Sequence, residues 1–544
     1  MNTIINKIAF VVLLALSMHS ISAQTENPVI SAIQKEVDRN KTELKMEGMP
    51  SPFFISYSVL DWYEYNLSAS LGSINSYNEY HYRSGLPMLL VGDYLRNNLK
   101  INERPFYPST TTLIDNTPGI AITAWDQLDW MYKNAIEAFR IKLAIQQQQT
   151  QTEEEKNLPD YEQRKPVNMV LQPVPVKFDK AYWENYLRKV SETAKQYPEI
   201  LTSNVALTVQ NIMTYTYDTE GSQYATPYTL YKMVFSANTR ADDGQELFHT
   251  TWTENATFEQ MPNLDTYINE CKTLLEDLIK LKNAPVINDA YSGPVLFEDR
   301  AVEYLFRTTF FQNSNKLIAS PTTIQQNNRQ GGNDFELMLD KKVISRNITI
   351  KSITGEEFYK GQRLNGYYAV DDEGVVPEKE LMLIENGVLR NLLNGRKPTK
   401  KIQHSNGHVR FDYNSYQKRV IPGNIVISCN QTFSKDELRK KLLETAKEED
   451  FEYAYIIRDI INNHIYRIKV SDGSEELVRG AAMTDVNIKT FKRIMGATDN
   501  ELLYSFGTPQ TTVIFPDAML FEDMDITRMA NIDFKKPYIV PKPK

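Results

Sequence analysis

Histidines are the residues with which a metal-dependent hydrolase most often holds its ion, and this chain has six of them. None is followed by glutamate, so the H-E-x-x-H pattern of a zinc peptidase helix is absent. His404 and His408 are four positions apart, the spacing of two ligands on one helical face. Because S-N-G, a turn sequence, lies between them, we expect loop histidines there, with a metal role as the alternative.

Other motifs that carry hydrolytic or nucleotide chemistry are also missing. The chain has no G-x-S-x-G, no G-x-x-x-x-G-K-[S/T] and no G-x-G-x-x-G. Its two cysteines, Cys271 and Cys429, fall in stretches typical of core packing, and whether they pair is left open. Adjacent acids at Glu298 and Asp299 and at 371–373 are common on solvated loops. The residue types alone therefore identify no catalytic machinery.

Composition and the first residues indicate an exported globular protein. The 544 residues carry 61 Lys and Arg against 69 Asp and Glu, a net charge of −8, which provides no basic field for nucleic acid. Two cysteines exclude a disulfide scaffold. Lys7, the apolar run 8–16 and Ala23 are typical of a signal peptide over residues 1–23. No later stretch is apolar enough to span a bilayer, so we expect a periplasmic or secreted chain without a transmembrane segment.

The hydrophobic periodicity predicts two large halves that meet between Pro285 and Gly293. In the first half we expect a helix over 28–45, strands between 53 and 98, a long helix from about 126, a β-meander over 205–253 and a helix between Pro262 and Pro285. The polar tract 146–166 is interpreted as a linker or insertion.

The second half is rich in strand and turn signals. It opens with an apolar strand at 294–297 and a helix over about 299–313. Further strands are expected at 343–350, 453–458 and 464–470, and N-G at 386–387 predicts a hairpin. Ser434 and Glu437 predict the capping box of another helix.

Residues 371–374 (D-D-E-G), followed by 383–389 (L-I-E-N-G-V-L), resemble the TldD/PmbA family, also called modulators of DNA gyrase or TldD/TldE metallopeptidases. The family's glycine-rich T-G-N-G-R-R-like loop is altered here to Q-H-S-N-G-H-V-R at 403–410. Weaker similarities, at 68–72, 91–94, 219–222, 241–244, 293–297 and 477–481, extend over most of the mature chain. The resemblance implies an α+β fold, with an N-terminal α/β domain over 24–290 and a β-rich C-terminal domain over 291–544. It also implies a dimer that encloses a central cavity.

The resemblance also implies where a zinc site would lie. In the TldD branch, the helix after the G-P-V-L-like strand carries H-E-x-x-x-H, and a cysteine nearer the C-terminus adds a ligand; the PmbA or TldE branch lacks this motif. Aligned on residues 305–312, the two histidine positions become Arg307 and Gln312, and the glutamate position becomes Thr308. These groups cannot replace two imidazoles and a general base. We therefore expect no zinc and no other cofactor, and we favour a core helix over the floor of a metal-free cleft.

Three functions are left open by the sequence. The first is a metal-free, exported subunit of the family that binds unfolded peptide or complements a partner, as a homodimer or as a heterodimer with a TldD-like protein. The second is an active peptidase that uses other residues, and the third is a structural dimer without catalysis. Gyrase modulation fits an exported acidic chain poorly. The residues that we expect near a cleft are Glu298, Asp299, Glu303, Arg307, Thr308, Gln312, His404 and His408.

Overall fold

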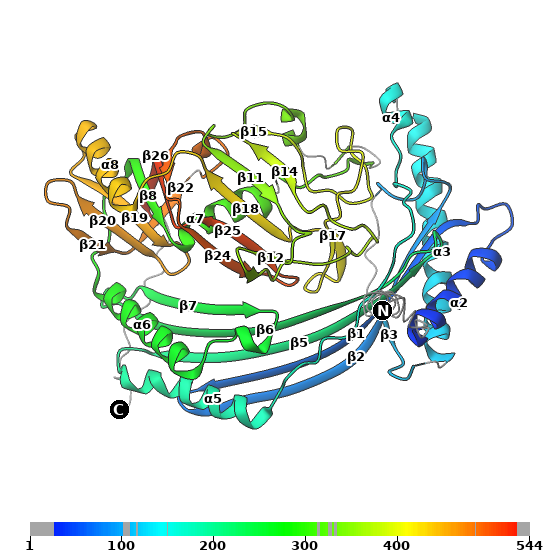
Figure 1. Ribbon diagram of the computed structural model, residues 1–544, viewed down its shortest axis with the longest axis horizontal. Coiled ribbons are helices and arrows are strands. Elements are labelled where there is room, and N and C mark those ends of the chain that lie inside the picture. The colour runs from blue at the N-terminus through cyan, green and yellow to red at the C-terminus, as the bar shows by residue number, and fades with distance from the viewer. Residues whose placement is uncertain are drawn as a thin grey trace, which may run out of the picture.

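The computed structural model describes residues 27–101, 109–115, 118–148, 151–312, 316–324, 329–330, 334–484 and 486–529. The predicted signal peptide, residues 1–23, lies outside them. Figure 1 shows a long curved sheet with helices on its outer face and at one end, and a β-rich second part that sits on its inner face. The α+β class with a β-rich C-terminal part, expected from the resemblance, is confirmed.

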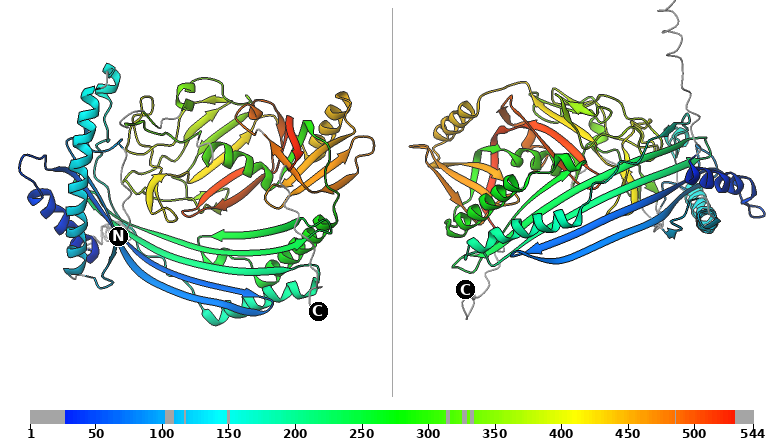
Figure 2. Two further views of the ribbon diagram at one scale, coloured as in Figure 1. Left: turned by 180° about the vertical axis from the view of Figure 1, so that it is seen from behind. Right: turned by 60° about the horizontal axis from the view of Figure 1, so that its bottom comes forward.

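The long sheet has seven strands in the order β3-β2-β1-β5-β6-β4, with β7 also paired to β6. Every pair is antiparallel except β4 with β6. The 19-residue strands β1 and β2 are well beyond the usual 3–10 residues, which gives the sheet its length in Figure 2. The strands are β1 Pro52–Ser70, β2 Ser73–Val91, β3 Ser109–Thr111, β4 Asn168–Val170, β5 Thr202–Asp218, β6 Gln223–Arg240 and β7 Glu246–Asn255.

Helices bury apolar faces against both ends of this sheet. At one end α2, Pro28–Glu43, and α3, Pro118–Gln148, share a core that contains Ile33 and Leu128. At the other end α5, Lys180–Glu192, and α6, Leu264–Asn283, share a core that contains Trp183. The predicted start of α3 at 126 is wrong by eight residues, because Ile120 and Ala124 continue the buried stripe toward the N-terminus.

The tract 146–166 is not a simple solvated linker. It contains a short helix, α4, Glu153–Asn157, and then Asp160 and Tyr161, which are 5% and 1% exposed. The Asp160 carboxylate pairs with the buried ammonium of Lys142 on α3. Local polarity did not reveal this burial, because the apolar contacts of Tyr161 come from Phe54 in a distant strand.

The C-terminal part holds two sheets around one large core. One sheet has the order β15-β14-β11-β18-β25-β24; the other has β21-β20-β19-β8-β26-β22, with β23 also paired to β26. The strands of the first are β11 Ile348–Ser352, β14 Leu381–Glu385, β15 Val388–Leu389, β18 Asn424–Cys429, β24 Glu501–Phe506 and β25 Thr511–Pro516. Those of the second are β8 Tyr291–Glu298, β19 Tyr453–Asp459, β20 His464–Lys469, β21 Glu475–Val478, β22 Ala481–Thr484, β23 Ile494–Ala497 and β26 Ala518–Arg528.

Several local predictions hold in this part and two need correction. The 386–387 hairpin and the capping box of α8, Lys435–Glu448, are confirmed. The strand expected at 343–350 begins only at Ile348, since residues 343–347 form a turn against the hairpin. The helix expected over 299–313 is α7, Arg300–Phe306, continued by a π-helix, Arg307–Phe311.

The two parts of the chain meet through a small apolar cluster. Trp62 and Tyr228 from the long sheet pack against Phe411 and Tyr413, which belong to or follow β16. β16, Val409–Asp412, and β17, Gln417–Val420, form a separate two-stranded hairpin on the sheet's inner face. Among the described residues, no helix has the length and apolar character needed to cross a membrane.

Candidate functional site

The site expected from the sequence begins where β8 turns into α7. Asp299 stands at this junction with φ +53°, a conformation that strains a residue other than glycine. Its backbone N–H donates to the carbonyl of Asp517 at 2.8 Å, and its carboxylate lies 3.4 Å from the ammonium of Lys435. The turn is therefore tied to the residue between β25 and β26 and to α8, and α7 enters the core between the two sheets from this point.

The π-helix that follows α7 places Arg307 and Gln312 side by side. The N–H of Gln312 donates to the carbonyl of Arg307, five residues earlier, at 3.0 Å, which is the π-type bond. The side chains meet as well, because Nη1 of Arg307 donates to Oε1 of Gln312 at 2.6 Å. One turn earlier, Nε of Arg307 donates to Oε1 of Glu303 at 2.7 Å. Glu303, Arg307 and Gln312 thus form one line of polar contacts along the helix.

This line lies in a largely desolvated environment. Glu303 is 1% exposed, and its burial raises the pKa of the carboxyl while the neighbouring Arg307 opposes that rise. The guanidinium of Arg307 sits 4.8 Å from the ring centroid of Phe506 in β24. Two turns earlier, Arg300 lies 4.1 Å from the ring centroid of Trp252 in β7. The helix is therefore held between the C-terminal core and the long sheet.

The groups on this helix do not fit a zinc ion. A guanidinium carries only donors and has no lone pair for a metal. The carboxylate of Glu303 is engaged by Arg307, and the hydroxyl of Thr308 donates to the carbonyl of Tyr304 at 2.8 Å. In the described part of the chain, no group of three or more His, Cys, Asp or Glu could hold a metal.

Both cysteines lie away from this helix as free thiols. Cys271 is buried in the core between α6 and the long sheet, and Cys429 ends β18. Burial raises the pKa of both thiols, so neither is a reactive thiolate.

A cavity of about 930 Å³ opens at the C-terminal end of the π-helix. Phe311 and Gln312 line it, together with loops 394–397 and 506–511 and the β16–β17 hairpin. Arg307 and Thr308 do not line it, but Arg307 contacts both Gln312 and Phe506, which do. The volume is within the range of about 300–1,000 Å³ that small-molecule sites occupy.

Five cationic side chains and two carboxylates line this cavity. The cations come from three segments of the chain and are Lys316, Arg396, Lys397, Lys418 and Arg419; the carboxylates are Glu373 and Asp412. An acidic protein therefore has a cavity wall of predominantly positive charge.

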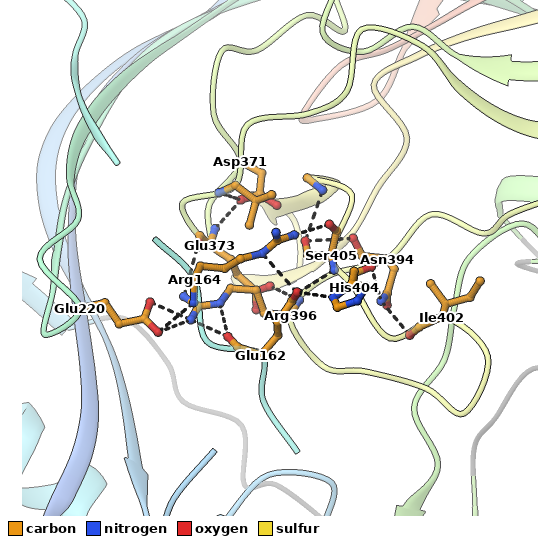
Figure 3. A network of polar contacts seen from close by, with 12 residues as sticks. Glu162, Arg164, Glu220, Asp371, Glu373, Asn394, Arg396, Ile402, His404 and Ser405 are labelled. Atoms are coloured by element: carbon orange, nitrogen blue, oxygen red, sulfur yellow. Dashed lines mark hydrogen bonds and ion pairs between the residues drawn. The ribbon is translucent and has the colours of Figure 1, made fainter. Parts of the chain in front are cut away.

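Arg396 fixes one side of the cavity through the polar network in Figure 3. Its side chain is 1% exposed; Nη2 lies 2.7 Å from both carboxylate oxygens of Glu220, and Nε and Nη2 donate to the carbonyl of Glu162 at 2.9 and 2.7 Å. The ring of Tyr161 lies 4.3 Å from the guanidinium. Residues of the long-sheet part and of the C-terminal part are thus joined directly beside the cavity.

The remaining predicted residues are distributed over separate places. The ring of His404 is exposed, and its Nδ1 lies 2.8 Å from Oε1 of Glu162. His408 is fully buried between Ser352 and Asn406, at 2.9 and 2.8 Å, and burial lowers its pKa to about 3. Glu298 ends β8 and pairs with Arg458 of the neighbouring strand β19 at 2.8 Å. The structure therefore brings Glu303, Arg307 and Gln312 together, and leaves both histidines and Glu298 apart from them.

Sequence reasoning passed over the residues that shape the cavity. Asn394, Gly395 and Arg396 lie in a loop that bends at 396–397, and N-G-R-K at 394–397 is a charged loop signal in the sequence. Asp371, named in the sequence as an adjacent acid and as part of the 371–374 motif but given no role there, is wholly buried and accepts the N–H groups of Glu373, Val375 and Val409 at 2.8–3.0 Å. Burial, with the neighbouring Glu373, raises the pKa of Asp371 to about 7.

Comparisons with known proteins agree with this architecture. Residues 291–527 match the family described as PmbA/TldA metallopeptidase C-terminal domain. The fold resembles that of a protein described as a modulator of DNA gyrase from Thermotoga maritima, with 14% identity, a TM-score of 0.58 and coverage of 91% of this chain and 100% of that one.

Two further solved structures are similar over nearly their full length. TldE from Thermococcus kodakarensis shares 11% identity with a TM-score of 0.53, and covers 91% of this chain and 100% of its own. A protein described as a modulator of DNA gyrase from Bacteroides thetaiotaomicron shares 10% identity with a TM-score of 0.55, over 92% and 98%. No curated protein matches the chain.

The fold and the matched domain together define the class of protein: a long-sheet part joined to a TldD/PmbA-type β-rich part. Residues 291–527 match the C-terminal domain of the PmbA/TldA metallopeptidase family, and the described chain has the fold of those three solved structures.

Proposed function

We propose that this chain is a metal-free binding subunit of the TldD/PmbA family, which holds an unfolded peptide or supports a partner and does not itself cut. The observation that carries the proposal is the π-turn at Arg307 and Gln312. It aligns two side chains five residues apart, the spacing of an H-E-x-x-x-H pair, but fills both positions with groups that bond to each other. The second support is the cavity next to Gln312, which is large enough for a short segment of peptide.

Metal content and peptide cleavage test this proposal together. The mature chain is purified from zinc-supplemented cells, and its zinc content is measured by mass spectrometry. The same preparation is then assayed for binding and for cleavage of a reduced, unfolded protein. We expect less than one zinc in ten chains, saturable binding of the unfolded protein and no cleavage. One zinc per chain together with cleavage that stops with a chelator, or on substitution of Glu303→Gln, would refute the proposal.

The partner and the location are further parts of the same proposal. One of the similar structures is TldE, and its likeness supports an assembly with a second family member or a second copy of this chain. Light scattering of the purified chain, alone and mixed with a TldD-like protein, tests this; a monomer in both samples contradicts it. Export predicts a mature N-terminus at Gln24, which N-terminal sequencing of the protein from the cell envelope checks.

A further inference from the structure

We infer that the cavity beside Gln312 binds the C-terminal end of a peptide, with the free α-carboxylate against its cationic wall and the last side chain against its apolar wall. This inference rests on the proposed peptide-binding function and names which part of the peptide is recognised.

The charges of the cavity wall favour an anion. Its two carboxylates are already engaged by the protein: Oε2 of Glu373 accepts the backbone N–H of Arg396 at 2.7 Å, and Asp412 pairs with Arg419. Asp412 also accepts the N–H of Asn414 at 2.9 Å and the hydroxyl of Ser415 at 2.8 Å. The carboxylates therefore act as internal supports of the wall. Of its five cations, Arg396 is paired with Glu220 and Arg419 with Asp412, so the charge that meets a ligand comes from a lysine.

Lys418 is the cation best placed to meet a ligand carboxylate. Its Nζ donates to the carbonyl of Asp372 at 2.8 Å and to the hydroxyl of Ser58 at 3.3 Å, and both acceptors are neutral. An ammonium has three donors, so one donor and the whole charge are left for a ligand. The side chain is only partly exposed, which reduces screening by water and strengthens its attraction for an anion.

An apolar wall faces the same space. Phe311, Ile318, Val420, Phe506 and Pro509 all line the cavity. A peptide C-terminus presents a carboxylate and an apolar side chain within one residue, whereas an internal glutamate holds its charge at the tip of a polar side chain. The mixed wall therefore matches a chain end better than an acidic internal segment.

The experiment compares three forms of one fluorescein-labelled octapeptide that ends in Val-Leu-Phe: the free acid, the C-terminal amide, and the amide with one internal glutamate. Binding to the full mature chain is followed by fluorescence anisotropy at low and at physiological salt. We expect the free acid to bind at least tenfold more tightly than either amide, with a difference that shrinks as salt rises.

Substitution of Lys418→Met keeps the length of the side chain and removes its charge. We expect it to weaken the free acid about tenfold and to leave the amide unchanged, while the exposed control Lys440→Met on α8 changes neither. If Lys418→Met impairs folding, Lys316→Met takes its place in the test. Lys316 lines the cavity outside the β16–β17 hairpin, and we expect its substitution also to weaken binding of the free acid.

Equal binding of the acid and the plain amide overturns this inference and leaves the proposed peptide-binding function intact. Equal binding of the acid and the glutamate-containing amide also overturns it, because the wall would then bind any carboxylate of the peptide and would not distinguish the chain end. No binding of any form refutes the proposed peptide-binding function as well.

Discussion

The ion pair between Glu303 and Arg307 provides the sharpest test of how this helix is built. The two side chains are 2% and 12% exposed and lie 2.7 Å apart. We consider three variants: Glu303→Leu, Arg307→Met, and the double substitution. Both replacements are close to the original side chains in volume, so the comparison isolates charge from packing.

Burial decides the expected magnitudes. Removing one partner of a buried pair leaves an uncompensated charge and costs about 3–5 kcal/mol in the free energy of unfolding. We expect Arg307→Met to reach this range, because the Glu303 left behind is almost fully buried. Glu303→Leu should cost less, since Arg307 keeps its bond to Gln312 and its contact with Phe506. The double variant removes both charges and should lie within about 2 kcal/mol of the original chain.

These free energies are measured by unfolding in urea, which is monitored by tryptophan fluorescence and by circular dichroism. Trp252, one of the five tryptophans, stacks on Arg300 of α7, so part of the emission reports on this region. The exposed pair Lys440 and Glu444, at 77% and 58% exposure, is the matched control, with an expected coupling of about 0.5 kcal/mol or less. If the single costs at Glu303 and Arg307 simply add in the double variant, the two side chains do not form a buried unit and the reasoning fails.

Three further predictions follow from buried groups elsewhere. Burial lowers the pKa of His249 to about 4 and of His408 to about 3, so both imidazoles are neutral in the fold; the stability that each contributes is present above pH 6.5, and each should lower the free energy of unfolding by about 2 kcal/mol as pH falls from 7 to 5. The buried Asp371, whose pKa is raised to about 7, acts in the opposite direction over this range, so the loss is measured by urea unfolding against the His249→Gln and His408→Gln variants, and variants with the same pH dependence as the original chain would contradict it. Arg396→Lys should cost about 3 kcal/mol despite keeping the charge, because an ammonium cannot span both oxygens of Glu220 and the Glu162 carbonyl; a urea midpoint equal to the original would disprove this. Asp299→Gly should raise the free energy of unfolding by about 1 kcal/mol, since glycine tolerates φ +53°, and a loss on urea unfolding would show that the Lys435 contact matters more.

Local signals in the sequence predicted many of the elements correctly. The capping box at Ser434 and Glu437, the N-G turn at 386–387 and the apolar stripe of α6 each involve residues within a few positions of one another. Such interactions are encoded in short stretches, so one sequence is enough to find them. The resemblance pointed to Arg307 and Gln312, and Glu303 was named only as a candidate acid; neither the contacts that join the three side chains nor the π-turn was predicted.

The errors have one physical cause. Helix α3 begins earlier than expected, and Asp160 and Tyr161 are buried, because their partners lie in distant strands and helices. A polar tract and a buried docking segment have the same local composition. Only the packing of the C-terminal part against the long-sheet part distinguishes a solvated polar tract from a buried docking segment.

The sequence by itself determined that no histidine stands between His249 and His404, and therefore that the helix after β8 carries no imidazole for a metal. It also indicated individual elements such as α6, α8 and the 386–387 hairpin, because periodicity and turn signals act over a few residues, whereas α5 was not predicted. The tertiary structure alone decided that cations from residues 316, 396–397 and 418–419 surround one cavity. These segments are far apart along the chain, and what brings them together is the burial of the two C-terminal sheets against a common core, which no local pattern records.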